Sequence, residues 1–112
     1  MSEEPTAARK AFGHITPKLT EIFDKTLFGD VCIRPNLSPR DRSLVTVASL
    51  ISLYRTNELP FHLKKTLENG LTRNELVETI THLAFYSGCP TAMSALPIAQ
   101  RAFDEAEAKP KA

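Results

Sequence analysis

Residues 72–88 read TRNELVETITHLAFYSG and carry a clear helical pattern. Thr72 and Glu75 have the spacing of a capping box, in which each side chain satisfies a backbone amide at the start of a helix. The apolar residues that follow recur at helical spacing and end at Ser87-Gly88; they are Leu76, Val77, Ile80, Leu83 and Ala84. The stretch therefore predicts an amphipathic helix with one apolar face.

Start and stop signals predict four further helices. Thr16-Pro17 begins one over residues 17–27, and Ser38-Pro39 begins another over residues 38–55. A third lies between Pro60 and Asn69-Gly70, and the last begins at Pro90, with Pro97 expected to bend it. No strand pattern is visible, so the sequence predicts an all-α, single-domain bundle of about five to six helices.

The helix over residues 38–55 is expected to be the buried centre of this bundle. Its apolar residues cover nearly the whole circumference, which is typical of a helix surrounded by others. They are Leu44, Val45, Val47, Ala48, Leu50, Ile51, Leu53 and Tyr54.

Length and composition limit the remaining possibilities. The chain has 112 residues, 42% of them hydrophobic, which is enough for the core of one domain. We expect this domain at residues 12–107 and flexible termini at residues 1–11 and 108–112. The longest apolar run, residues 44–53, is shorter than the roughly 20 residues that span a bilayer. The first residues hold no apolar signal segment, so a cytoplasmic protein without a membrane partner is expected. A net charge of +1 and no basic stripe argue against nucleic acid.

The two cysteines, Cys32 and Cys89, form neither a CxxC motif nor a zinc spacing, so neither a metal site nor a structural disulfide is predicted. Cys89 stands beside Pro90 at a predicted helix start, where unpaired amides and the helix dipole favour a thiolate. Cys89 is thus a candidate reactive sulfur. The alternative is that a small apolar residue simply fills buried space there.

The polar face of the helix over residues 72–88 carries candidate functional residues. Glu78, His82 and Tyr86 follow one another at intervals of four, and Phe85 lies beside them. Two aromatic residues on a face that would otherwise be exposed to water suggest that another molecule buries this face, and the simplest such molecule is a partner subunit. We therefore expect these four residues at a subunit seam or cleft. The alternative is an ordinary surface contact between Glu78 and His82, worth a few tenths of a kcal/mol.

His62 follows Glu58 by four residues on the helix that contains Pro60. A histidine in such a place is more often structural than catalytic, and the spacing alone does not decide between the two interpretations.

Three stretches resemble the carboxymuconolactone decarboxylase family. They are FDKTLFGDV, LSPRDRSLVTVASLI, and TNELPFHLKKTLENGLTRNELVETITHLAFYSGCPTAMSAL. The resemblance contains, in order, Arg40 and Arg42, the ELPFH segment, the ENGLTRNEL turn and the HLAFYSG segment with Pro90 two residues later. This ordered set is more specific than any single motif.

The resemblance implies a bundle of the alkylhydroperoxidase D type and a homo-oligomer, either a trimer or a hexamer built from dimers. The peroxidase branch of that group has a CxxC motif followed four residues later by histidine. If His62 is that histidine, the cysteine positions fall on Arg55 and Glu58, so the sequence sides with the decarboxylase branch. Relatives often have tryptophan where this chain has Cys32 and Cys89.

The reaction that the resemblance implies removes CO2 from a lactone acid without metal or organic cofactor. Such a site needs a group for the substrate carboxylates, an oxyanion stabiliser and a proton source. His82 or His62 is expected to donate the proton, and Glu58 to orient His62. Tyr86 is expected to donate a hydrogen bond to the oxyanion. Arg42 is expected to bind a substrate carboxylate, the alternative being that it is only a surface charge.

Two other functions remain open at this point. The first is a thiol-dependent peroxidase or reductase that uses Cys89, with Cys32 or a partner's cysteine as the resolving thiol. The second is an oligomeric binding protein without turnover, because membership of a fold does not guarantee chemistry.

Overall fold

The computed structural model describes residues 6–108 of the chain, and within them the regular structure is helical throughout. The predicted all-α fold class is confirmed. The chain divides between Pro39 and Arg40 into two compact units, which are described separately. None of the helices in residues 6–108 combines the length and hydropathy needed to cross a bilayer.

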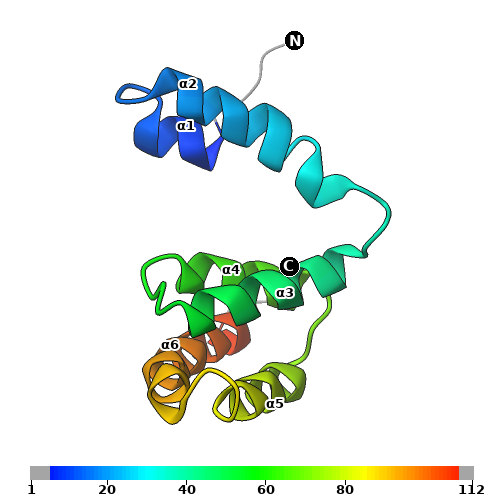
Figure 1. Cartoon of the computed structure of the whole chain (residues 1–112), viewed down its shortest axis with the longest axis vertical. Helices are drawn as coiled ribbons and strands as arrows, with labels where there is room; N and C mark the ends of the chain where they lie inside the picture. Colours follow the sequence, from blue (N-terminus) through cyan, green and yellow to red (C-terminus); the bar gives the residue numbers. More distant parts are fainter. Residues whose placement is uncertain (1–5, 109–112) are drawn as a thin grey trace. The chain divides into compact units, whose positions relative to one another are not determined.

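The first unit consists of short helices. It contains α1 (Ala7–Phe12), α2 (Pro17–Ile22), the π-helix η1 (Phe23–Leu27) and the 3-10 helix η2 (Val31–Ile33). Helices α1 and α2 lie side by side (Figure 1). The helix predicted over residues 17–27 is confirmed in its extent, but its last turn is of the π type, and the amide of Phe28 donates to the carbonyl of Phe23 at 2.8 Å.

Helix α1 includes residues 7–11, for which a flexible terminus was expected. The Thr6 side chain caps the helix by accepting a hydrogen bond from the amide of Arg9 at 3.1 Å. A guanidinium nitrogen of Arg9 lies 3.4 Å from a carboxylate oxygen of Asp24, which ties α1 to η1. The cap signal at Thr6 is local, but six residues are too few to show a clear helical period.

The second unit holds the remaining helices. They are α3 (Pro39–Ser52), α4 (Leu59–Glu68), α5 (Arg73–Leu83) and α6 (Cys89–Ala108). Both α4 and α5 pack against α6 (Figure 1). Helix α4 is followed by Gly70 at a φ of 106°, and the predicted left-handed conformation at this glycine is confirmed. Helix α6 continues through Pro97 and extends to Ala108, into the stretch expected to fray.

The predicted capping box at the start of α5 is confirmed. The Thr72 hydroxyl accepts a hydrogen bond from the amide of Glu75 at 3.1 Å, and the Thr72 amide donates to the Glu75 carboxylate at 2.9 Å. Helix α5 ends at Leu83, four residues earlier than predicted. The chain continues as turns to Ser87, whose amide donates to the carbonyl of Leu83 at 2.7 Å.

The hydrophobic core lies in the second unit and draws on all four of its helices. Its buried members are Val47, Ile51, Leu59, Leu63, Leu71, Leu76, Ile80, Ala92, Ala95, Ala99 and Phe103. Each fully buried leucine contributes about 1.5–3 kcal/mol relative to an exposed one. The small side chains on α6 allow α4 and α5 to approach it closely.

Helix α3 is less buried than the sequence predicted. Only Val47 and Ile51 are buried, whereas Val45 is 58% exposed and Leu53 is 68% exposed. The prediction of a buried central helix was therefore wrong for the single chain. One face of α3 packs on the core, and residues 40–108 leave its other side open. Exposed apolar side chains of this kind mark a surface that another molecule or segment covers.

Candidate functional site

A groove of about 460 Å³ runs between α3 and α5. Its walls are mostly apolar on the α3 side and more polar on the α5 side. The lining residues are Leu44, Val45, Ala48, Glu75, Glu78, Thr79, His82 and Leu83. Of the residues predicted to carry chemistry, His82 lines this groove.

His82 and Tyr86 form a stacked pair at the end of α5. Their ring centroids are 4.7 Å apart and their planes are inclined by 27°. The imidazole is exposed on the last turn of α5, and Tyr86 follows in the turn after that helix, where it is 78% exposed. Phe85 beside it is 82% exposed. The ring of Tyr86 thus stacks on an imidazole that lines the groove, while Tyr86 itself is not a lining residue.

Arg40 and Glu75 join α3 to α5 at the groove. The Arg40 guanidinium pairs with the Glu75 carboxylate, which also accepts the hydrogen bond from the amide of Thr72. That amide is the main reason why the pKa of Glu75 lies below its usual value, and the charge of Arg40 lowers the pKa further. The sequence signalled Glu75 only as a cap. Its pairing with Arg40 is a long-range contact without a local signal.

His62 is half-buried on α4, outside the lining of this groove. Its ring meets the ring of Phe61 edge to face, with 5.0 Å between centroids. Burial lowers the pKa of His62 below its ordinary 6.5, and the negative charge of Glu58 offsets part of that shift. The imidazole is therefore predominantly neutral at pH 7.

Polar contacts beside His62 join α4 to α3. The Thr66 hydroxyl lies 2.7 Å from the carbonyl of His62 within α4 and 3.4 Å from the carbonyl of Ser43 on α3, and both carbonyls accept a hydrogen bond from it. One turn further, the Asn69 amide group donates to the hydroxyl of Ser43 at 2.8 Å. These bonds fix the backbone that carries His62 relative to the first half of α3.

Glu58 precedes α4 as its N-cap residue but makes no side-chain cap there. Its carboxylate accepts a hydrogen bond from Nε of Arg55 at 2.9 Å. Its influence on His62 is an electrostatic one, through the pKa. Arg55 and Glu58 thus form an ion pair in the connection between α3 and α4.

The other predicted residues lie apart from the groove lining. Arg42 is half-buried near the start of α3, where its carbonyl accepts a hydrogen bond from the Thr46 hydroxyl at 2.9 Å. Cys89 is exposed as the first residue of α6, preceded by Gly88 at a φ of 103°. Cys32 is half-buried in η2 of the first unit, and both sulfurs are free thiols. Within residues 6–108 no group of three potential metal ligands comes together.

Comparison with known proteins identifies the family. Residues 17–101 match the model of the carboxymuconolactone decarboxylase family, so the match runs through both compact units. The chain is 41% identical over 78 residues to 4-carboxymuconolactone decarboxylase of Acinetobacter baylyi, an alignment that covers 70% of this chain and 58% of that protein. It is 31% identical over 85 residues to nitrosuccinic acid decarboxylase npaB of Metarhizium robertsii, with 76% of this chain and 59% of that protein covered.

A third relative, an uncharacterized 15.0 kDa protein of Paracoccus denitrificans, is 26% identical over 98 residues, which cover 86% of this chain and 73% of the relative. The chain spans somewhat more than half the length of the two decarboxylases. The family match extends over most of the described residues, and the chain therefore belongs to the carboxymuconolactone decarboxylase family.

Proposed function

We propose that the protein removes CO2 from a small lactone acid or a related carboxylate, without a cofactor, in the groove between α3 and α5. The observation that carries this proposal is the stacked pair of His82 and Tyr86, in which His82 lines a largely apolar groove. The names of two relatives, both decarboxylases, support the reaction class. The choice of a lactone acid as substrate, and with it a role in aromatic catabolism, is taken from the name of one of these relatives.

The chemistry needs a proton and a place for negative charge. The bond between the carboxylate and its carbon breaks, CO2 leaves, and the electron pair moves toward the lactone carbonyl. His82 then delivers a proton to carbon and recovers one from water. The carbonyl of the substrate accepts the electron pair, so the step requires no separate electron sink. Apolar walls such as Leu44 and Leu83 favour the loss of a charged carboxylate as neutral CO2.

Tyr86 and Arg42 complete the proposed assignment. The Tyr86 hydroxyl would donate a hydrogen bond to the developing oxyanion, because it stands one helical turn beyond His82. Arg42 would bind a substrate carboxylate from the start of α3, where Arg40 already reaches Glu75 in the groove wall.

We further propose that a second copy completes the groove and supplies His62 and Glu58 in a homo-oligomer, a trimer or a hexamer. Within one chain, neither residue lines the groove. Exposed aromatic rings accompany both histidines, Phe61 beside His62 and Phe85 beside His82. Burying these rings against each other would form a seam that contains both imidazoles.

A mixing experiment tests the shared site. His62→Gln and His82→Gln variants are assayed alone for CO2 release from carboxymuconolactone, and then after dissociation and reassembly as an equal mixture. If the site is shared, each variant alone is inactive, and the mixture regains about a quarter of the wild-type activity, because random pairing restores both imidazoles at about one seam in four. Two inactive variants that stay inactive when mixed would contradict the shared site.

The exposed thiol of Cys89 at the first residue of α6 favours a second candidate, a thiol-dependent peroxidase. Its thiolate would attack the O–O bond of a peroxide, forming sulfenic acid and releasing an alkoxide or hydroxide, and a second thiol would then form a disulfide and release water. Peroxide treatment followed by mass spectrometry with a thiol label tests it, with Cys32→Ser as control. An unoxidised Cys89 contradicts the peroxidase. If an intact oligomer shows neither CO2 release nor peroxide-dependent oxidation of Cys89, the remaining candidate is a binding protein without turnover.

A further inference from the structure

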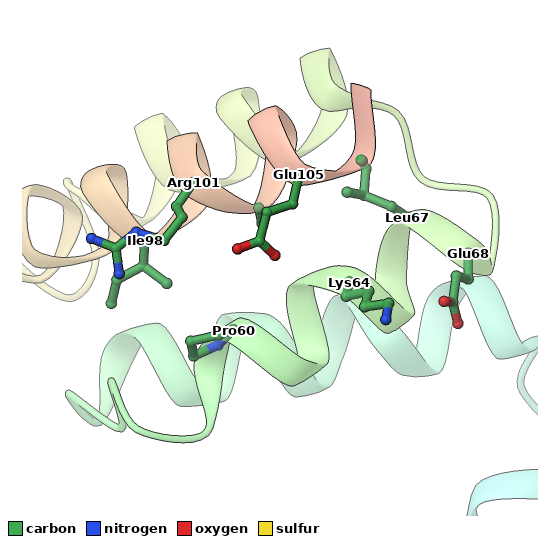
Figure 2. A pocket seen from close by; sticks show the side chains of 9 residues that line it. Pro60, Lys64, Leu67, Glu68, Ile98, Arg101 and Glu105 are labelled. Carbon is green, nitrogen blue, oxygen red and sulfur yellow. The ribbon is translucent and has the colours of Figure 1, made fainter. Parts of the chain in front are cut away.

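An ion pair crosses the groove between α3 and α5, where the Arg40 guanidinium on α3 meets the Glu75 carboxylate on α5. Another groove, of about 360 Å³, lies between α4 and α6, and charged side chains from both helices stand along it (Figure 2). They are Lys64, Glu68, Arg101 and Glu105. Within residues 6–108 no ion pair joins the two walls of that other groove. The crossing at Arg40 and Glu75 therefore distinguishes the groove of the proposed reaction.

The ion pair lies at the end of its groove that is remote from His82. On α3, Arg40 stands one and two helical turns before the lining residues Leu44 and Ala48. On α5, the lining begins at Glu75, and His82 follows two turns later, about 10 Å along the helix at a rise of about 1.5 Å per residue. A molecule whose reacting carbon lies at His82 therefore has roughly this distance before it meets the ion pair.

The Glu75 carboxylate is held from two sides. One of its oxygens accepts a hydrogen bond from the Thr72 amide at 2.9 Å, and the other pairs with Arg40, whose guanidinium also donates to the Asp41 carboxylate at 3.3 Å. The side chains of Arg40 and Glu75 are 40% and 42% exposed, so water solvates the outer side of the pair. An apolar group pressed against the pair would remove this water without replacing its hydrogen bonds, which is unfavourable.

We propose that the ion pair of Arg40 and Glu75 is the end stop of the groove and restricts the substrate to short, compact carboxylic acids. This inference rests on the reaction proposed for the groove, and Arg40 acts in it as a specificity-determining residue. Between His82 and the pair the α3 wall is apolar, so each methylene group buried there strengthens binding by about fourfold. A methylene group that reaches the pair gains no affinity, because it must displace water from two charged groups.

Straight-chain monocarboxylic acids, from propanoic to decanoic acid, test the end stop. Their single carboxylate is the one that leaves in the proposed reaction, so with this group at His82 the chain extends toward the ion pair. Dissociation constants are measured from the NMR shift of the His82 imidazole. In the wild type, the dissociation constant should fall by about fourfold per methylene group and level off once the chain reaches the pair. In Arg40→Ala, it should keep falling for the longer acids and stay at the wild-type value for the shorter ones.

Two further variants complete the experiment. Arg40→Lys keeps a cation that can pair with Glu75, so it should restore the length limit. Arg73→Ala is the matched control, because Arg73 lies on α5 outside the groove lining, where its guanidinium is 3.9 Å from the carboxylate of Glu107. This control should keep the length limit of the wild type.

The outcomes separate the end stop from the reaction itself. A wild-type affinity that rises over the whole series would overturn the end stop and leave the reaction site in place. An equal change for short and long acids in Arg40→Ala would also overturn it, because Arg40 would then bind the carboxylate or set the width of the groove. If none of the acids shifts the His82 signal, both the end stop and the proposed reaction site are wrong.

Discussion

The imidazole ring of His82 stacks on the phenol ring of Tyr86, with 4.7 Å between their centroids and 27° between their planes. His82 lines the groove between α3 and α5, so the ring of Tyr86 is in contact with a lining residue although it does not line the groove itself. The stacking of the Tyr86 ring and the proposed donation by its hydroxyl can therefore be tested separately.

Tyr86→Phe separates these roles. Phenylalanine keeps the stacked ring and removes only the hydroxyl, so we expect kcat/KM for CO2 release to fall by roughly 10²–10³ if that hydroxyl stabilises the oxyanion. Tyr54→Phe is the matched control, because Tyr54 is the other tyrosine of the chain and lies outside the groove lining. An unchanged kcat/KM in Tyr86→Phe would remove the hydroxyl from the chemistry.

The stability of the protein should depend on pH through His62. Burial lowers its pKa below 6.5, so below that pH the unfolded chain binds more protons than the folded one. The contribution of neutral His62 to the free energy of unfolding is fully present above pH 6.5. It is lost as the pH falls from 6.5 toward the lower pKa of His62 in the folded protein. Urea unfolding should show a steeper loss of stability in the wild type than in His62→Gln. Parallel pH profiles for the two proteins would contradict this.

Glu58→Gln should lower the pKa of His62 further. The carboxylate of Glu58 partly offsets the effect of burial, and the amide of glutamine does not. An NMR titration of the His62 imidazole measures the change, with Glu68→Gln at the other end of α4 as control. An equal or higher midpoint in Glu58→Gln would show that Glu58 does not act on His62.

Much of the fold was predictable because helix starts are local. Three helix starts were predicted from neighbouring residues, namely those at Pro17, at Pro39 and at the pair Thr72 and Glu75, and all three helices are present. The burial of α3 was not predictable, because Val45 and Leu53 are as apolar as Val47, and only packing decides which of them meets the core. Helix α5 ends at Leu83 and the chain continues in turns to Ser87, which the apolar spacing up to Ala84 did not signal.

In the candidate site too, contacts between residues close in sequence were predictable and contacts between distant residues were not. His82 and Tyr86 were predicted to lie together because they are one turn apart, and their rings are in contact. By contrast, Arg40 and Glu75 are far apart in sequence, so nothing local signalled their pairing. The relation of His62 to His82 also depends on long-range packing, and the single chain keeps His62 out of the groove lining.

Thr72→Ala should destabilise the second unit through the capping box. The substitution removes the acceptor for the amide of Glu75, which lies 3.1 Å from the Thr72 hydroxyl, and should lower the free energy of unfolding by about 1 kcal/mol. Thr81→Ala on the same helix is the control, because its hydroxyl bonds only to a carbonyl within the helix, and a change within about 0.5 kcal/mol is expected. Urea denaturation measures both, and equal effects would contradict the role of the cap.

The most direct test of the proposed reaction is the turnover of His82→Gln on carboxymuconolactone, measured as CO2 release from protein whose oligomeric mass matches the wild type. We expect kcat to fall by roughly 10²–10⁴, because glutamine cannot deliver the proton to carbon. His14→Gln, which alters an exposed histidine of the first unit, should leave kcat unchanged. Wild-type turnover by His82→Gln would contradict the assignment of the reaction to the groove between α3 and α5.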